Sequence, residues 1–257
     1  MGSKEIGELD SLSLYSYQAP TSAFSEAYRS MRTALMFSTA EGAPKVLHFT
    51  SVNAGEGKTT SAVSTAINFT QTGGNVLLID ADLRNPSLHK TFSVPNDVGL
   101  SNYLSGELGP AKVARKTGIE HLYVIPSGPI PPNPADLLSG ARMLDLVSLG
   151  EKRFDYVIID SPPVLGLADA IILADIAQAT LLVVSANSTR KGGLEAGLKR
   201  LSHSRASILG SILTMFEMKK AGYGYSYDYH YSYEYGADTD DDSVDFQPEG
   251  AKGATTG

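Results

Sequence analysis

Short runs of aliphatic residues recur along the chain, separated by stretches with helical periodicity. Near-continuous Val, Ile and Leu is typical of strands that are covered on both faces of a sheet. The pattern predicts six strands, at Val46–Ser51, Val76–Asp80, Leu122–Pro126, Tyr156–Asp160, Thr180–Ser185 and Ile208–Thr214. Helices are predicted between them, notably at 58–72, 141–152, 168–176 and 192–204. This alternation predicts an α/β fold, a doubly wound and mostly parallel sheet with helices on both faces and ligands at the carboxyl ends of the strands.

The two ends of the chain lack this pattern. Residues 1–20 are polar, end at Pro20 and are expected to form an extended arm. An amphipathic helix is predicted over 22–39, with the apolar stripe Phe24, Tyr28, Met31 and Leu35. Residues 219–257 have no hydrophobic periodicity and are expected to be disordered. The expected organisation is therefore an arm, one domain over 21–218 and a tail.

Negative charge is concentrated in the tail. The 257 residues carry 21 Lys+Arg and 28 Asp+Glu, for a formal net charge of −7. From Ala221 onward there are eight acids and one base, so the remaining residues have 28 − 8 = 20 acids and 21 − 1 = 20 bases. A neutral body with an acidic tail argues against nucleic-acid binding, which needs clustered Lys and Arg. The lack of cysteine excludes disulfides and thiolate chemistry, and no apolar run approaches the roughly 18 residues of a membrane span.

The strongest local signal is Ala54-Gly55-Glu56-Gly57-Lys58-Thr59-Thr60, which follows a predicted strand and opens a predicted helix. Backbone N–H groups of such a loop form an anion nest, the helix N-terminus adds partial positive charge, and Lys58 supplies a cation for β- and γ-phosphates. Thr59 offers a hydroxyl to Mg²⁺. Together with Asn53, these residues are the predicted nucleotide-binding site. The full eight-residue pattern has Gly five positions before Gly57, where this chain has Val52.

Three carboxylates follow or end predicted strands. Asp80 and Asp82 come after 76–79, and Asp160 ends the strand at 156–160. In a parallel sheet all three meet the phosphate loop at one edge. Mg²⁺ prefers oxygen ligands and is usually held by one or two carboxylates with phosphate oxygens and water, which suits Asp82, Asp160 and Thr59. Asp80 then remains to accept the proton of an attacking hydroxyl. The predicted catalytic residues are Lys58, Asp80, Asp82 and Asp160.

Three segments together resemble the Walker A, Walker A′ and Walker B motifs of the bacterial tyrosine kinases (BY-kinases), the autokinases of exopolysaccharide and capsule export. They are Ala54–Thr60, Leu78–Pro86 and Ile159–Pro163. The resemblance implies a P-loop NTPase-type fold with ATP and Mg²⁺ as cofactors. It also implies two partners: a transmembrane polysaccharide co-polymerase as activator, fused or separate, and a cognate phosphotyrosine phosphatase. The implied location is the cytoplasmic face of the plasma membrane. The related partition ATPases usually carry a second lysine near the start of the phosphate loop, where this chain has Val52-Asn53-Ala54.

Seven of the 13 tyrosines occupy every second position of one part of the tail. They are Tyr223, Tyr225, Tyr227, Tyr229, Tyr231, Tyr233 and Tyr235. Disordered acidic segments normally have few aromatics, so this set predicts accessible phosphoacceptor hydroxyls and an ATP-dependent tyrosine autokinase. Two alternatives remain: a partition- or localisation-type ATPase switch without tyrosine transfer, and a nucleotide-binding scaffold whose tail is a docking peptide.

The predicted helix over 22–39 has a charged edge as well as an apolar stripe. Glu26, Arg29 and Arg32 lie about 80–200° around the helix from Phe24, at about 100° per residue, so they are expected to point outward. By itself this pattern fits a solvated face with an i,i+3 ion pair. In the family that the chain resembles, the same triplet lies at the interface of a ring. The resemblance therefore implies a homo-oligomeric ring with head-to-tail contacts, which phosphorylation of the tails is expected to loosen.

Three weaker features have more than one interpretation. Residues 126–134 form a proline-rich loop after a strand, which either lines the entry for tyrosine or is a plain connector. Arg84 either contacts phosphate or substrate, or pairs with an acid. The five histidines have no metal-ligand spacing and are expected to have core or surface roles.

Overall fold

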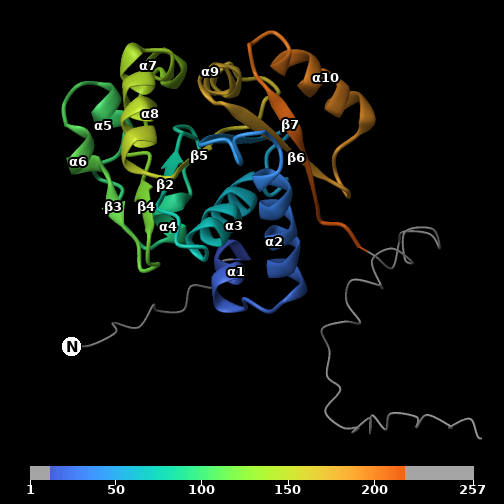
Figure 1. The fold of residues 1–257 in the computed structure, drawn as a ribbon. Coiled ribbons are helices and arrows are strands. Elements are labelled where there is room, and N and C mark those ends of the chain that lie inside the picture. The colour runs from blue at the N-terminus through green and yellow to red at the C-terminus, as the bar shows by residue number, and fades with distance from the viewer. Residues whose placement is uncertain (1–11, 218–257) are drawn as a thin grey trace, which may run out of the picture. The chain divides into compact units, whose positions relative to one another are not determined.

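The computed structural model describes residues 12–217, and seven strands in this range form one sheet (Figure 1). The strands are β1 (Val46–Ser51), β2 (Val76–Asp80), β3 (Arg115–Lys116), β4 (Leu122–Ile125), β5 (Tyr156–Asp160), β6 (Ala179–Ser185) and β7 (Ile208–Thr214). Their order across the sheet is β3-β4-β2-β5-β1-β6-β7. All pairs are parallel except β3 with β4. The predicted mostly parallel α/β sheet is confirmed, whereas β3 was not predicted because two charged residues carry no hydrophobic pattern.

Helices cover both faces of this sheet (Figure 1). The longer ones are α2 (Ala23–Met36), α3 (Lys58–Thr70), α8 (Ala141–Arg153), α9 (Asp169–Ile176) and α10 (Lys191–Leu201). The short ones are η1 (Leu12–Leu14), α1 (Tyr15–Gln18), α4 (Leu88–Thr91), α5 (Leu100–Leu104), α6 (Pro110–Val113) and α7 (Pro134–Leu138). The longer helices were all predicted within a few residues. Helices of three to five residues were not predicted, because so short a segment does not complete a helical period.

Strand side chains alternate between two layers of core. Leu78 packs in the cluster that contains residues of α2 and α3, whereas its neighbours Leu77 and Ile79 pack with α8 and α9. A third cluster joins β6 to α9 and α10 around Leu182. Because both faces are covered, the strands are aliphatic throughout, and polar residues appear where the strands end.

The first described residues differ from the predicted extended arm. Residues 12–18 form η1 and α1, which lie against α3. Leu14 is buried in the core cluster, and Ser16 is fully buried. The Oγ atom of Ser13 lies 3.3 Å from Oγ1 of Thr60. The polar composition of residues 1–20 did not predict this packing, which depends on the position of α3 in the fold.

Two other expectations concern the ends of the chain and the membrane. The predicted disorder of 219–257, and the tyrosines in that segment, lie outside the described residues. Within residues 12–217, none of the helices combines the length and the apolar character that crossing a membrane would require.

Candidate active site

The loop between β1 and α3 presents an unbroken row of backbone amides. Gly55 and Gly57 have φ values of +79° and +92°, which glycine adopts without strain. Among the described residues, no acceptor is bonded to the N–H groups of residues 54–60. The first hydrogen bond of the helix runs from the N–H of Ser61 to the carbonyl of Gly57, at 2.9 Å. Seven successive amides at a helix N-terminus form a concavity for an anion, so the loop fits a polyphosphate.

Glu56 holds this loop in shape from inside. Its buried carboxylate accepts hydrogen bonds from the backbone N–H of Asn53 at 2.9 Å, from the side-chain amide of Asn53 at 2.8 Å, and from the hydroxyl of Thr189 at 2.6 Å. The hydroxyl of Thr214 donates to the Glu56 carbonyl at 2.7 Å. The N–H of Asn53 is therefore turned into the loop, and its predicted part in nucleotide binding stays a prediction. Thr189 and Thr214 were not predicted, because neither stands in a recognisable motif.

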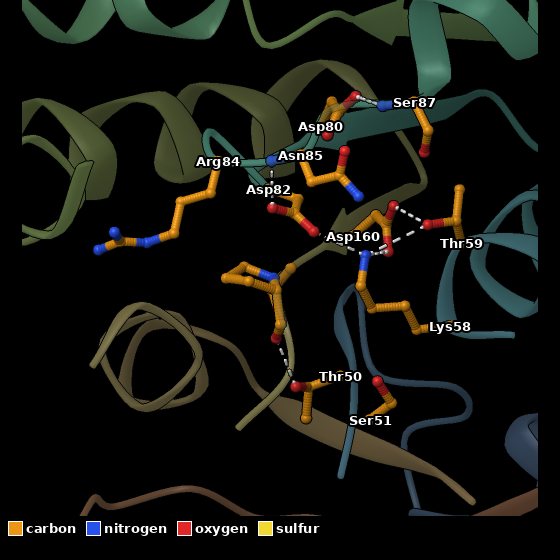
Figure 2. A network of polar contacts seen from close by, with 12 residues as sticks. Thr50, Ser51, Lys58, Thr59, Asp80, Asp82, Arg84, Asn85, Ser87 and Asp160 are labelled. Carbon is orange, nitrogen blue, oxygen red and sulfur yellow. Dashed lines mark hydrogen bonds and ion pairs between the residues drawn. The ribbon is translucent and has the colours of Figure 1, made fainter. Parts of the chain in front are cut away.

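Lys58 and two carboxylates form the centre of the site. The Nζ atom of Lys58 lies 2.9 Å from Oδ2 of Asp82 and 3.6 Å from Oδ1 of Asp160 (Figure 2). Thr59 donates its hydroxyl to Oδ2 of Asp160 at 2.6 Å. β2 and β5 are in register, with Asp80 directly opposite Asp160. The structure thus brings together Lys58, Thr59 and all three predicted acids at one edge of the sheet.

Asp80 is held differently from the other two acids. Its Oδ2 atom accepts the backbone N–H groups of Ser87 and Leu88, both at 3.0 Å, and its Oδ1 atom has no hydrogen-bond partner in residues 12–217 (Figure 2). Burial, followed by repulsion from Asp160, raises the pKa of Asp80 to about 7. A carboxyl group with this pKa exchanges its proton near neutral pH, as a general base must.

The remaining charges are set by burial and by mutual attraction. Burial raises the pKa of Asp160, against the opposing effects of Lys58 and Thr59. Burial by itself would lower the pKa of Lys58, but attraction to Asp160 and Asp82 outweighs it, and the pKa of Lys58 is raised. Lys58 is therefore an ammonium ion at neutral pH.

The donor set at this edge fits a hard divalent cation. Oxygen atoms of Thr59, Asp82 and Asp160 converge there, and three carboxyl groups surround a single ammonium group. In the part of the chain that the structure describes, no three His, Asp or Glu residues form a complete metal site. Mg²⁺ commonly takes only one or two carboxylates and completes its shell with phosphate oxygens and water, so these residues suit a magnesium–nucleotide complex.

Arg84 pairs with an acid, which decides between its two interpretations. Its Nε and Nη2 atoms donate to the two carboxylate oxygens of Asp169, at 2.8 and 3.1 Å. Asp169 is fully buried at the first position of α9. The backbone N–H of Asn85 donates to Oδ1 of Asp82 at 3.0 Å. The ion pair and this bond hold the loop after β2, and with it Asp82, in a defined position. Asp169 was not predicted as part of the site.

The charged residues of α2 are not equivalent. Glu26 and Arg29 form an ion pair, and Arg29 also donates to the carbonyl of Pro20 at 3.0 Å. Arg32 instead donates to the carbonyl of Asn68 in α3, at 2.8 Å. The expectation that all three point outward is therefore wrong for Arg32. A long arginine side chain at about 80° from the apolar stripe reaches back to the last turn of α3.

His48 has the core role that was expected for the histidines. Its ring nitrogens lie 3.1 Å from the hydroxyl of Thr180 and 2.7 Å from that of Ser161. Burial lowers the pKa of His48 to about 3, so the ring is neutral.

Comparisons with known proteins found a matching family model, similar kinases and similar solved structures. A family model described as an AAA domain matches residues 44–208. The tyrosine-protein kinase YwqD of Bacillus subtilis is 40% identical over 201 residues, covering 78% of this chain and 85% of that protein. Among solved structures, the kinase domain of the Escherichia coli tyrosine kinase ETK superposes with a TM-score of 0.75 at 34% identity, covering 78% of each chain. The chimerical protein CapA2B2 has a TM-score of 0.75 at 33% identity, over 78% of this chain and 88% of that one.

Proposed function

Because this chain belongs to the bacterial tyrosine-protein kinases, we propose that it transfers the γ-phosphoryl group of ATP to the tyrosines of segment 223–235, between copies of the same chain. The observation that carries this proposal is the convergence at one sheet edge of Lys58, three acids and seven backbone amides that bind no acceptor in residues 12–217. A role in regulating exopolysaccharide polymerisation and export rests on the motif resemblance.

In this proposal the residues divide into two groups by what they bind. The amides of residues 54–60 and the ammonium group of Lys58 bind the triphosphate. Thr59, Asp82 and Asp160 supply oxygen ligands for Mg²⁺. When bound, the metal neutralises charge on the phosphates during transfer. Arg84 and Glu56 act as positioning residues, because their contacts hold Asp82 and the phosphate loop rather than the substrate.

The proposed reaction is an in-line displacement. A tyrosine hydroxyl oxygen forms a bond to the γ-phosphorus, the bond from that phosphorus to the β–γ bridging oxygen breaks, and ADP leaves. The phenol proton passes to Oδ1 of Asp80, the oxygen that has no hydrogen-bond partner among residues 12–217, while Oδ2 stays bonded to two amides. Phosphoryl transfer depends mainly on positioning and charge stabilisation, so we expect Lys58 to contribute more to the rate than Asp80.

The proposal extends to assembly and regulation. Glu26 and Arg29, on the outer side of α2, are proposed to contact a neighbouring subunit of a ring, whereas Arg32 supports α2 from within the domain. A transmembrane polysaccharide co-polymerase is proposed as the activator at the cytoplasmic face of the plasma membrane, and a phosphotyrosine phosphatase as the enzyme that reverses the modification. These partners follow from the resemblance stated above.

Mass spectrometry of the full chain after incubation with ATP and Mg²⁺ tests the proposal. We expect phosphate on tyrosines of 223–235 in the wild type and none in Lys58→Met, because the variant loses the cation that binds the transferred phosphate. Lys152→Met, a matched change at an exposed lysine of α8, should behave as the wild type. Phosphotyrosine retained in Lys58→Met would overturn the assignment. ADP formation without phosphotyrosine in the wild type would instead favour a partition-type ATPase.

A further inference from the structure

The proline-rich loop after β4 begins beside the proposed general base. β4 lies next to β2 on the side away from β5, with Ile125 opposite Ile79. Pro126, the residue after β4, is therefore next in register beside Asp80. On the other side of β2, Asp160 is paired with Asp80. Neighbouring strands are about 4.8 Å apart. The loop thus starts about one strand spacing from the main chain of Asp80, and the phosphate loop lies on the opposite side.

The base of this loop is fixed, and its tip is exposed. The N–H of Gly128 donates to Oδ1 of Asn96 at 2.9 Å, and the N–H of Leu100 donates to the carbonyl of Pro126 at 2.7 Å. The tip has no charged residue and reads Pro129-Ile130-Pro131-Pro132-Asn133. Ile130 is 65% exposed. Because proline restricts the backbone, this apolar surface loses little conformational entropy when something binds to it.

The tail tyrosines are spaced so that one ring can lie beside the loop while another is at Asp80. In an extended chain, residues two apart lie on the same side and are about 6.6–6.8 Å from each other. The tyrosines of 223–235 occupy every second position, so their rings share one side when the chain is extended. When one hydroxyl reaches Asp80, the ring two positions away is about 6.6–6.8 Å along the segment, which exceeds one strand spacing of about 4.8 Å and allows it to reach past Pro126 on the side of the loop. Tyrosine rings also pack well on proline and aliphatic groups.

We propose that the loop tip, residues 129–133, docks the acceptor segment of a second copy of this chain by packing on the aromatic ring two positions from the tyrosine being phosphorylated. This inference rests on the proposed kinase function and adds the sequence preference of its acceptor. β7 is parallel to its neighbour and ends at Thr214 on the same sheet edge. Tyr229 is 15 residues farther along, or at most about 50 Å of extended chain, which is the reach available to the segment for entering a second copy's site.

Two acceptor peptides test this preference. Both cover residues 223–235 and keep Tyr229 as their single tyrosine; one has Phe at the other six positions, and the second differs from it by Ala at 227 and 231. The enzyme is the full chain with its seven tail tyrosines changed to Ala, so that it offers no acceptor of its own. We expect the KM for the Phe peptide to be about tenfold lower, equivalent to about 1.4 kcal/mol.

The same comparison in two enzyme variants localises the effect. In Ile130→Ala the ratio of the two KM values should fall to about threefold or less, because the docking surface has lost its aliphatic side chain. In Leu144→Ala, a matched change at a 52% exposed leucine of α8, the tenfold ratio should remain. The KM for ATP should be the same throughout, since the loop lies on the side of Asp80 away from the phosphate site. A drop in the ratio that is confined to Ile130→Ala supports docking.

Two results would overturn the inference while leaving the kinase function intact. One is an equal KM for the two peptides with the wild-type loop, and the other is an unchanged ratio in Ile130→Ala. If no enzyme phosphorylates either peptide although ATP binds, the proposed kinase function fails, and the docking inference fails with it.

Discussion

Asp80→Asn should make the nucleotide-free protein more stable at alkaline pH while impairing it as a kinase. Asp80 is fully buried beside Asp160, and its pKa is raised from 3.8 to about 7. For an acid with a raised pKa in the folded state, the stabilisation is complete below the unfolded pKa and is lost as pH rises toward the folded pKa. Ionised Asp80 therefore opposes folding at neutral pH and above. Asparagine does not ionise, and its carbonyl oxygen can still accept the amides of Ser87 and Leu88.

The size of the effect follows from the two pKa values. One pKa unit corresponds to about 1.4 kcal/mol. Between pH 5 and pH 8 the unfolded carboxyl is almost fully ionised, whereas the folded carboxyl ionises only near pH 7. Over this range the wild type should lose about 2.5 kcal/mol of unfolding free energy relative to Asp80→Asn. For a domain of this size, that corresponds to a relative shift of about 5–10 °C in melting temperature.

Urea unfolding without nucleotide or phosphate, at several pH values from 5 to 8, measures this difference. The quantity of interest is the difference in unfolding free energy between wild type and variant, because other groups that titrate, including Asp160, contribute to both curves. Asp145→Asn, at an exposed position of α8, should follow the wild type. Parallel curves for wild type and Asp80→Asn would show that Asp80 ionises normally and would remove the physical basis for its role as the base.

Three further variants test contacts around the site. Thr189→Val removes a hydrogen bond to the buried carboxylate of Glu56, so nucleotide titration should show about five- to tenfold weaker ATP binding. Unchanged affinity would mean that Glu56 holds the loop without the hydroxyl of Thr189. Arg84→Ala leaves the buried carboxylate of Asp169 unpaired and should lower the free energy of unfolding in urea by about 2–3 kcal/mol. A decrease of less than about 0.5 kcal/mol would contradict this prediction. Arg29→Ala should lower the mass measured by analytical ultracentrifugation without affecting the melting temperature, and an unchanged mass would leave Glu26 and Arg29 as a solvated surface pair.

Local patterns in the sequence determined the sheet and the phosphate loop. The predicted strands at 46–51, 76–80 and 156–160 coincide with β1, β2 and β5, because a strand covered on both faces must be aliphatic wherever it lies in the sheet. The phosphate loop could also be predicted, because the glycines, the start of the helix and the lysine are contiguous in the chain. The acids were placed correctly at one edge, because parallel strands all end there.

Only the tertiary structure decided which partners these residues have. The amides that hold one oxygen of Asp80 belong to Ser87 and to Leu88 at the start of α4. Thr189 lies 133 residues from Glu56, and Asp169 lies 85 residues from Arg84. Strand order brings such residues together, and hydrophobic periodicity does not encode strand order. The sequence also did not predict that Arg32 bonds to α3 or that residues 12–18 pack against it. Both depend on contacts with α3, which is distant in the chain: Arg32 donates to the carbonyl of Asn68, and Leu14 is buried in the core cluster that includes residues of α3.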